Sequence, residues 1–232
     1  HWSLIPVEVQ ILDKGFVRLD ATDATDLSVV NAARVSFGVR NEELSEKDKG
    51  LIGFLMREKH GTPFEHNFFR FHIKAPIFVV REWFRHRIGW SYNEYSGRYS
   101  EMPQEAYMPE PEQMRTQVGK PGAYTFEPMD EWEAETARTA IKLGYFQAFN
   151  AYDMLLSKGV AKEVARLVIP VGAYTEFYAT TNARALMNFI NLRGDSNAQW
   201  EIQQYAMALD ECFKEAMPVT HSHFVKNDRV AP

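Results

Sequence analysis

Residues 67–76, NFFRFHIKAP, constrain the fold most strongly, because large apolar side chains alternate there with basic ones. Successive side chains of a strand point to opposite faces of a sheet, so this alternation predicts a strand with one buried face. Pro76 then opens a predicted helix over 76–87, PIFVVREWFRHR, since proline is tolerated in the first turn of a helix. The chain therefore passes directly from a half-buried strand into a helix.

Other segments carry similar patterns. Alternation around Lys14-Gly15 predicts two short strands joined by a turn over 7–20, and residues 172–181 are also strand-like. Residues 101–125 contain four prolines and little periodicity, which predicts a loop lying over a site. Helices are predicted over 26–37 (N-cap Asp26), 45–61 (capping box Ser45 and Asp48, C-cap Gly61), 130–159 (Asp130 and Glu133 at its start, Gly159 at its end), 161–170, 182–194 and 198–218.

A few strands among many helices predict a single α+β domain over residues 1–232, with a small, mostly antiparallel sheet packed against helices. We leave residues 1–4 out of the functional interpretation, as a purification-tag remnant or a disordered end. The chain has 232 residues, of which 45% are apolar and 25% charged, as in globular proteins that bury a sizeable core.

The formal net charge of −5 counts against general nucleic-acid binding, which requires a basic surface. Any anion site must therefore be local. No apolar run is long enough to span a membrane, so no membrane partner is expected. The one cysteine, Cys212, cannot form an intrachain disulfide, which predicts a cytoplasmic location.

The stretch RHRIGWSYNEYSGRYS (85–100) concentrates positive charge in this acidic chain. Cations in the last turn of the helix 76–87 interact favourably with the helix dipole, which is a purely structural explanation. The following loop favours a second explanation, because Ser96 and Arg98 supply donors and Gly97 lets the backbone approach a ligand. Arginine binds phosphate with paired donors, so the segment predicts a site for a phosphate-bearing ligand.

The predicted helix 182–193 has polar residues on two sides. Arg184, Asn188 and Asn191 share one stripe, whereas Asn182 and Arg193 lie on roughly the opposite side. Both stripes could be solvated. Alternatively, the helix lies between two bound ligands or subunits, and the sequence alone does not decide between these interpretations.

Neither the histidines nor the cysteine predict further chemistry. The spacing of His60, His66 and His72 matches neither a helical face nor a zinc motif, so no metal is expected. Cys212 lies on the apolar face of its predicted helix without an adjacent base to activate it. It is therefore predicted to be a core residue and not a nucleophile.

Several motifs together resemble the flavin-dependent thymidylate synthases. The Arg-His-Arg at 85–87, followed after eight residues by Ser96, resembles the characteristic motif of that family. Six more segments resemble it in the expected order over about residues 7 to 217: AARVSF, HGTPFEH, KAPIFVVREWFRHR, EVARLVIP, TTNARALMNFINLR and AQWEIQQYA.

The resemblance implies a thymidylate synthase-complementing type of fold and a homotetramer with FAD bound where subunits meet. It implies that dUMP becomes dTMP, that 5,10-methylenetetrahydrofolate donates the carbon, and that NADPH reduces the flavin, which supplies the hydride. The implied FAD contacts are Ser36, His60, Thr62, Arg85, His86, Arg87, Glu94, Asn182, Arg184 and Asn188. The implied dUMP contacts are Glu82, Arg85, Glu94, Ser96, Gly97, Arg98, Arg166 and Arg193.

This chemistry agrees with the residues themselves. The pyrophosphate of FAD and the phosphate of dUMP are anions, and the arginine clusters could bind them. Cys212 is unsuited to attack uracil, so Arg193 is expected to be catalytic by stabilising negative charge on the ring. Two rival classes remain open at this point: a module that clasps nucleic acid with the Arg/Tyr/Trp loop, and a metal-dependent hydrolase that uses the histidines at 60, 66 and 72.

Overall fold

The structure, a computed structural model, describes residues 8–232. Residues 1–4, which were set aside above, lie outside the described residues. Five strands form one antiparallel sheet in the order β1-β2-β3-β7-β4. Their bounds are β1 Glu8–Ile11, β2 Gly15–Thr22, β3 Phe69–Pro76, β7 Tyr174–Thr181 and β4 Trp90–Glu94. The α+β class and the mostly antiparallel sheet are confirmed.

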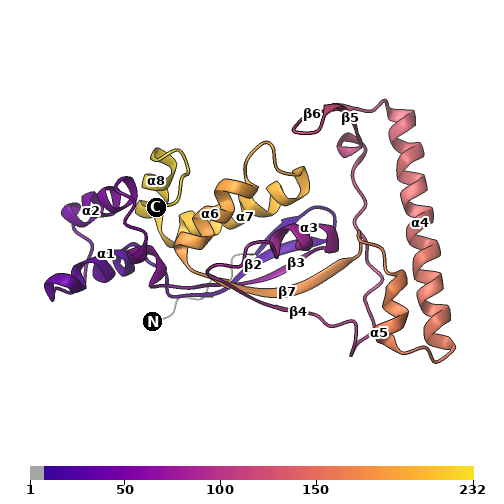
Figure 1. The fold of residues 1–232 in the computed structure, drawn as a ribbon, viewed down its shortest axis with the longest axis horizontal. Helices are drawn as coiled ribbons and strands as arrows, with labels where there is room; N and C mark the ends of the chain where they lie inside the picture. The colour runs from indigo at the N-terminus through magenta and orange to yellow at the C-terminus, as the bar shows by residue number, and fades with distance from the viewer. Residues whose placement is uncertain (1–7) are drawn as a thin grey trace.

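The helices gather on one face and at both ends of this sheet (Figure 1). They are α1 Asp26–Arg34, α2 Glu46–Arg57, α3 Ile77–Trp83, α4 Glu131–Ser157, α5 Lys162–Ala165, α6 Ala183–Arg193, α7 Trp200–Ala216 and α8 Pro218–Lys226. The helices α3, α6 and α7 lie over the sheet, while α1, α2 and α8 lie together at one end. Phe69, Phe71 and Ile73 are fully buried beneath them, as their alternation in the sequence predicts.

An arm extends from the other end of the sheet (Figure 1). It contains α4, α5 and a separate hairpin of β5 (Arg115–Lys120) and β6 (Ala123–Pro128). Only Ala134 and Tyr152 are buried among the 27 residues of α4, so most of this helix faces outward. No helix in the described part of the chain combines the length and the apolar character needed to cross a membrane.

Several predicted helix ends are wrong. Thr25, not Asp26, caps α1, because its hydroxyl accepts a hydrogen bond from the backbone of Ser28. Asp26 instead caps α8, where its carboxylate accepts hydrogen bonds from the backbones of Val219 and Thr220 at 3.0 and 2.7 Å. The helix predicted over 45–61 begins at its Ser45–Asp48 capping box but ends at Arg57.

Other departures concern whole elements. The helix predicted over 76–87 ends at Trp83, so residues 85–87 form a turn and not a last helical turn. Residues 90–94, interpreted as loop, form β4, and the predicted loop 101–125 contains β5 and the start of β6. The helix predicted over 161–170 is α5 followed by a 3₁₀ turn, Arg166–Val168. The sequence interpretation did not foresee α8.

Candidate functional site

The basic turn after α3 packs against the start of α6. Gly89 has φ +74°, and a Cβ atom at this position would lie 2.8 Å from Cβ of Ala185 and 3.3 Å from the amide nitrogen of Asn182. The hydroxyl of Thr181 donates to the Gly89 carbonyl at 2.9 Å. A side chain at 89 would therefore be both strained and obstructed. This close approach places Gly89, two residues after Arg87, beside Asn182, although the two lie nearly a hundred residues apart in the sequence.

Arg193, the last residue of α6, is held by α3 and the basic turn. Its Nε atom donates to Nε2 of His86 at 2.9 Å, and its Nη2 atom donates to the carbonyl of Glu82 at 3.0 Å. Its Nη1 atom donates to a carboxylate oxygen of Glu82 at 3.1 Å, which forms an ion pair. The guanidinium therefore has three acceptors on one neighbouring segment.

Burial sets the protonation of this group. Burial, together with a smaller effect of the adjacent Arg193 charge, lowers the pKa of His86 to about 4, so the imidazole is neutral at pH 7. Burial raises the pKa of Glu82, while the charge of Arg193 opposes that rise. The permanently charged guanidinium of Arg193 therefore donates to a neutral imidazole, His86, and to an acidic side chain, Glu82.

A second group surrounds the loop after β4. A Cβ atom at Gly97 would lie 2.8 Å from the sulfur of Met102, so this glycine permits close packing against Met102, and Cδ of Arg166 lies 3.5 Å from the same point. Arg98 forms an exposed ion pair with Glu163 at 3.3 Å. Glu94 accepts a hydrogen bond from the hydroxyl of Thr175 at 3.1 Å. Two guanidinium groups therefore border the Ser96–Arg98 loop.

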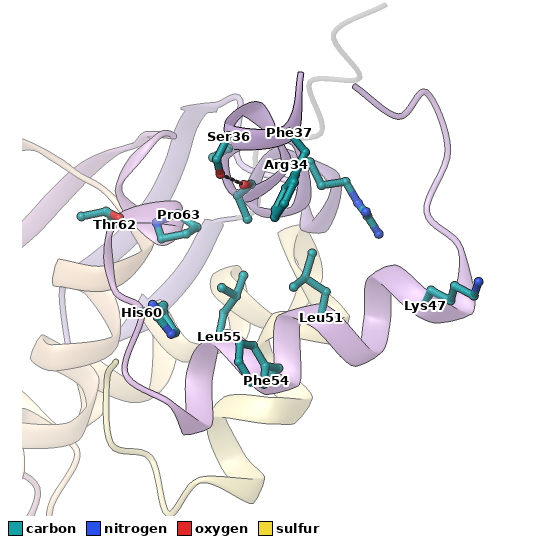
Figure 2. A pocket seen from close by; sticks show the side chains of 12 residues that line it. Arg34, Ser36, Phe37, Lys47, Leu51, Phe54, Leu55, His60, Thr62 and Pro63 are labelled. Atoms are coloured by element: carbon teal, nitrogen blue, oxygen red, sulfur yellow. Dashed lines mark hydrogen bonds between the residues drawn. The ribbon is translucent and has the colours of Figure 1, made fainter. Parts of the chain in front are cut away.

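A third group lines a pocket of about 590 Å³ between α2 and the segment after α1 (Figure 2). Ser36, His60 and Thr62 all border it, although the sequence predicted them only through family resemblance. The rings of His60 and Phe54 stack with their centres 5.8 Å apart. The pocket also has apolar walls and a cation, Lys47, at its edge.

Arg184 lies beside this pocket. It donates to Glu65 and to the backbone carbonyl of Pro232, both at 2.7 Å. A Cβ atom at Gly61 would lie 2.4 Å from the guanidinium carbon of Arg184, which explains why a glycine precedes Thr62. Arg184 therefore adjoins the His60–Thr62 segment, as a shared ligand site requires.

The predicted site residues thus fall into three groups that no hydrogen bond or ion pair joins within residues 8–232. The first contains Glu82, Arg85, His86, Arg87, Asn182 and Arg193; the second contains Glu94, Ser96, Gly97, Arg98 and Arg166; the third contains Ser36, His60, Thr62 and Arg184. Asn188 is exposed on α6 apart from these contacts. The site assignment itself remains a prediction.

Sequence reasoning missed residues that support the first group. The Tyr92 hydroxyl donates to the backbone carbonyl of His86 at 2.7 Å, and the His86 ring packs on Phe189 with centres 4.7 Å apart. The spacing of Phe189 and Arg193 on one face of α6 was a usable signal, since residues four apart in a helix are neighbours.

Cys212 is fully buried in the core, as expected. Burial raises the pKa of its thiol to about 12, with smaller contributions from Glu215 and Glu211, so the thiol is protonated at neutral pH. In the described part of the chain, no three histidine, cysteine or acidic side chains come together as metal ligands.

The sequence and the α+β fold are both shared with proteins of known class. The sequence profile of the thymidylate synthase complementing protein family matches residues 19–219. The chain is 49% identical over 220 residues to a flavin-dependent thymidylate synthase of Thermosipho africanus (strain TCF52B), with 95% of each chain covered. It is 45% identical over 228 residues to one of Streptomyces coelicolor (strain ATCC BAA-471 / A3(2) / M145), with 93% of each covered.

A solved structure, the UMP/dUMP methylase PolB from Streptomyces cacaoi bound with 5-Br UMP, is similar with a TM-score of 0.88 and 39% identity, over 97% of this chain and 100% of that one. The chain belongs to the thymidylate synthase complementing protein family, that is, to the flavin-dependent thymidylate synthases. Membership makes it a flavin-dependent methyltransferase of dTMP synthesis. The family implies FAD as the cofactor, with NADPH and 5,10-methylenetetrahydrofolate as co-substrates.

Proposed function

We propose that this protein converts dUMP to dTMP by reductive methylation, with 5,10-methylenetetrahydrofolate as the carbon donor, and without a cysteine nucleophile. The observation that carries the proposal is the Arg193 group, which presents a fixed cation where the resemblance expects dUMP. The buried, protonated Cys212 cannot serve as an attacking thiolate.

FAD would be held mainly by the first and third groups, with Glu94 of the second group and Asn188 as further contacts. Arg85 and Arg87 are exposed, and within residues 8–232 their guanidinium groups have no ion-pair partner, so they are free to bind a pyrophosphate. The pocket beside His60 combines stacked rings, apolar walls and hydroxyl groups, which suits a flat, partly polar ring system. The remaining proposed contacts are Ser36, Thr62, His86, Glu94, Asn182, Arg184 and Asn188. FAD, once reduced by NADPH, supplies the hydride.

The dUMP phosphate would bind at the second group, between Arg98 and Arg166, with donors from Ser96 and the backbone of Gly97. Arg193 would meet the uracil ring and stabilise negative charge as N3 loses its proton. That charge makes C5 nucleophilic, so the ring attacks the incoming methylene group without a covalent bond to the protein. Glu82, Arg85 and Glu94 complete the proposed dUMP contacts.

We further propose that the protein is a homotetramer of single-domain subunits, with FAD where subunits meet. No hydrogen bond or ion pair joins the three groups within residues 8–232, so subunit contacts would complete the site. The exposed α4 leaves large apolar residues such as Trp132 and Phe146 available for burial in an interface. A monomer that holds stoichiometric FAD would contradict this arrangement. The single, buried cysteine also suits a reducing cytoplasm.

The test is to purify the protein, measure bound flavin from its absorbance, and follow dTMP formation while dUMP, the folate, FAD and NADPH are omitted in turn. We expect dTMP only with all four, and tetrahydrofolate as a product. Formation of dTMP without flavin, or none with the complete mixture, would refute the proposal. UMP should be assayed alongside dUMP, because the similar PolB is described as a methylase of both.

A further inference from the structure

The orientation of Arg193 depends on a neutral ring nitrogen. A guanidinium group can only donate hydrogen bonds, and its Nε atom points at Nε2 of His86 from 2.9 Å. This contact requires that Nε2 carry a lone pair and not a proton. His86 is therefore the tautomer protonated at Nδ1, and its Nε2 atom is fully engaged by Arg193.

The ring and the backbone of His86 are each held in place. Phe189, one helical turn before Arg193, packs against the ring at 4.7 Å between centres and an interplanar angle of 59°. Tyr92 fixes the backbone carbonyl of His86 at 2.7 Å. The ring is half-buried, which disfavours its charged form. The lone pair is therefore presented at a fixed place, as a preorganised acceptor must be.

From this geometry we infer that His86 is a positioning residue for Arg193. It fixes the Nε edge of the guanidinium while Glu82 fixes the two terminal nitrogens, so the plane of the group is set before dUMP arrives. The inference rests on the proposed function, because it gives His86 a role in turnover only if Arg193 acts on uracil. The proposed contact of His86 to FAD would then use another atom of the residue, because Nε2 is engaged by Arg193.

The experiment compares two substitutions at 86. His86→Gln places an amide oxygen near the position of Nε2 and keeps an acceptor, whereas His86→Phe keeps the ring that packs on Phe189 but removes the acceptor. We expect His86→Phe to lower dTMP turnover per bound flavin by about 10- to 100-fold, the effect of one hydrogen bond to a charged group. His86→Gln should recover most of that loss. Thermal melting verifies that both variants are folded.

A matched control is His72→Phe. His72 is also partly buried, stacks on Tyr178 with centres 5.0 Å apart and contacts Glu176, but it lies on the sheet away from Arg193. Its substitution should leave turnover unchanged. In addition, His86→Phe combined with Arg193→Ala should be no slower than Arg193→Ala alone, because one residue acts through the other.

Three results from these variants would overturn the inference. Equal loss in the Gln and Phe variants would exclude the acceptor role. If His86→Phe loses FAD but keeps normal turnover per bound flavin, His86 binds the cofactor and does not position Arg193. Independent losses in the double variant would show that His86 does not act through Arg193.

Nitrogen NMR of the ligand-free protein, labelled in its histidine rings, tests the hydrogen bond apart from activity. At pH 7 it should show His86 protonated at Nδ1 and not at Nε2, with a shift of the Nε2 resonance in Arg193→Ala. A proton on Nε2 would overturn the inference even in an active enzyme. Wild-type protein that forms no dTMP, or an Arg193→Ala variant with normal turnover, would instead refute the proposed function.

Discussion

Replacement of Arg193 by alanine should reduce dTMP formation by about 10²–10³, the cost of losing one preorganised donor to a charged transition state. The substitution removes every donor of the guanidinium group, including those that reach Glu82 and His86. Uracil would then have to lose its N3 proton without a nearby cation. The loss should appear in turnover, since the charge develops during the reaction and not on binding.

Stability should change little by comparison. The side chains of Arg193 and Glu82 are 23% and 27% exposed, so their ion pair is partly solvated and should contribute about 1 kcal/mol or less to the free energy of unfolding. Burial already raises the pKa of Glu82, and without Arg193 this carboxyl would protonate more readily. Protonation limits the cost of leaving it unpaired.

The matched variant is Cys212→Ala. This fully buried side chain packs in the core, and its truncation should lower the free energy of unfolding by about 1 kcal/mol, or roughly 2–4 °C in Tm for a chain of this size. Turnover should remain near that of the wild type. The assay measures dTMP formation and anaerobic reduction of the flavin by NADPH for both variants. A folded Cys212→Ala protein that binds FAD and dUMP but makes no dTMP would refute the reasoning, as would normal dTMP formation by Arg193→Ala.

Three further results are expected. Arg98→Ala should weaken dUMP binding by about 1.5–3 kcal/mol and FAD binding by less, so equal losses in calorimetry would exclude its assignment to the nucleotide. Asp26→Ala should lower the free energy of unfolding by about 1–3 kcal/mol in chemical denaturation, because three donors at the start of α8 lose their acceptor; an unchanged midpoint would contradict this role. Hydrogen bonds from Ser45 are the main cause that lowers the pKa of Asp48 from 3.8 to about 2. The ionised Asp48 therefore stabilises the folded protein fully above pH 4, and this contribution disappears as the pH falls towards 2. The difference in stability between wild type and Asp48→Asn should shrink from pH 6 to pH 2, and a constant difference would contradict it.

Local patterns predicted much of the fold because the interactions concerned span a few residues. The Ser45–Asp48 capping box is one example, since both partners lie in one turn. The exposed strands β5 and β6 have no buried face, and the alternation of Tyr124 and Phe126 with polar residues is too short to predict a strand. The start of α1 was misassigned for another reason. Asp26 is a good N-cap by type, but its carboxylate accepts from Thr220 of α8, 194 residues further along the chain, and Thr25 serves as the cap instead.

The candidate site likewise combines residues that the sequence predicted with contacts that it did not predict. Motifs placed arginines and polar residues in the correct segments, but no spacing predicts that Arg193 meets His86 across 107 positions. That contact exists because α6 packs over α3, which depends on the shapes of buried residues such as Trp83 and Phe189. The protonation of His86 follows from this packing and is equally invisible in the sequence. The family resemblance identified the candidate site residues, whereas the contacts between them are visible only in the fold.

The arginines near the site differ in whether a carboxylate neutralises them. Three arginines near the site have a carboxylate partner: Arg98 pairs with Glu163, Arg184 with Glu65 and Arg193 with Glu82. Arg85 and Arg87 differ, since no carboxylate pairs with either within residues 8–232, and they flank a turn whose Ile88 is 94% exposed. Two unpaired cations in close sequence repel each other in the free protein, so a bound phosphate or pyrophosphate would relieve that repulsion as well as form hydrogen bonds. An acidic chain can therefore bind an anion tightly at one place without a generally basic surface.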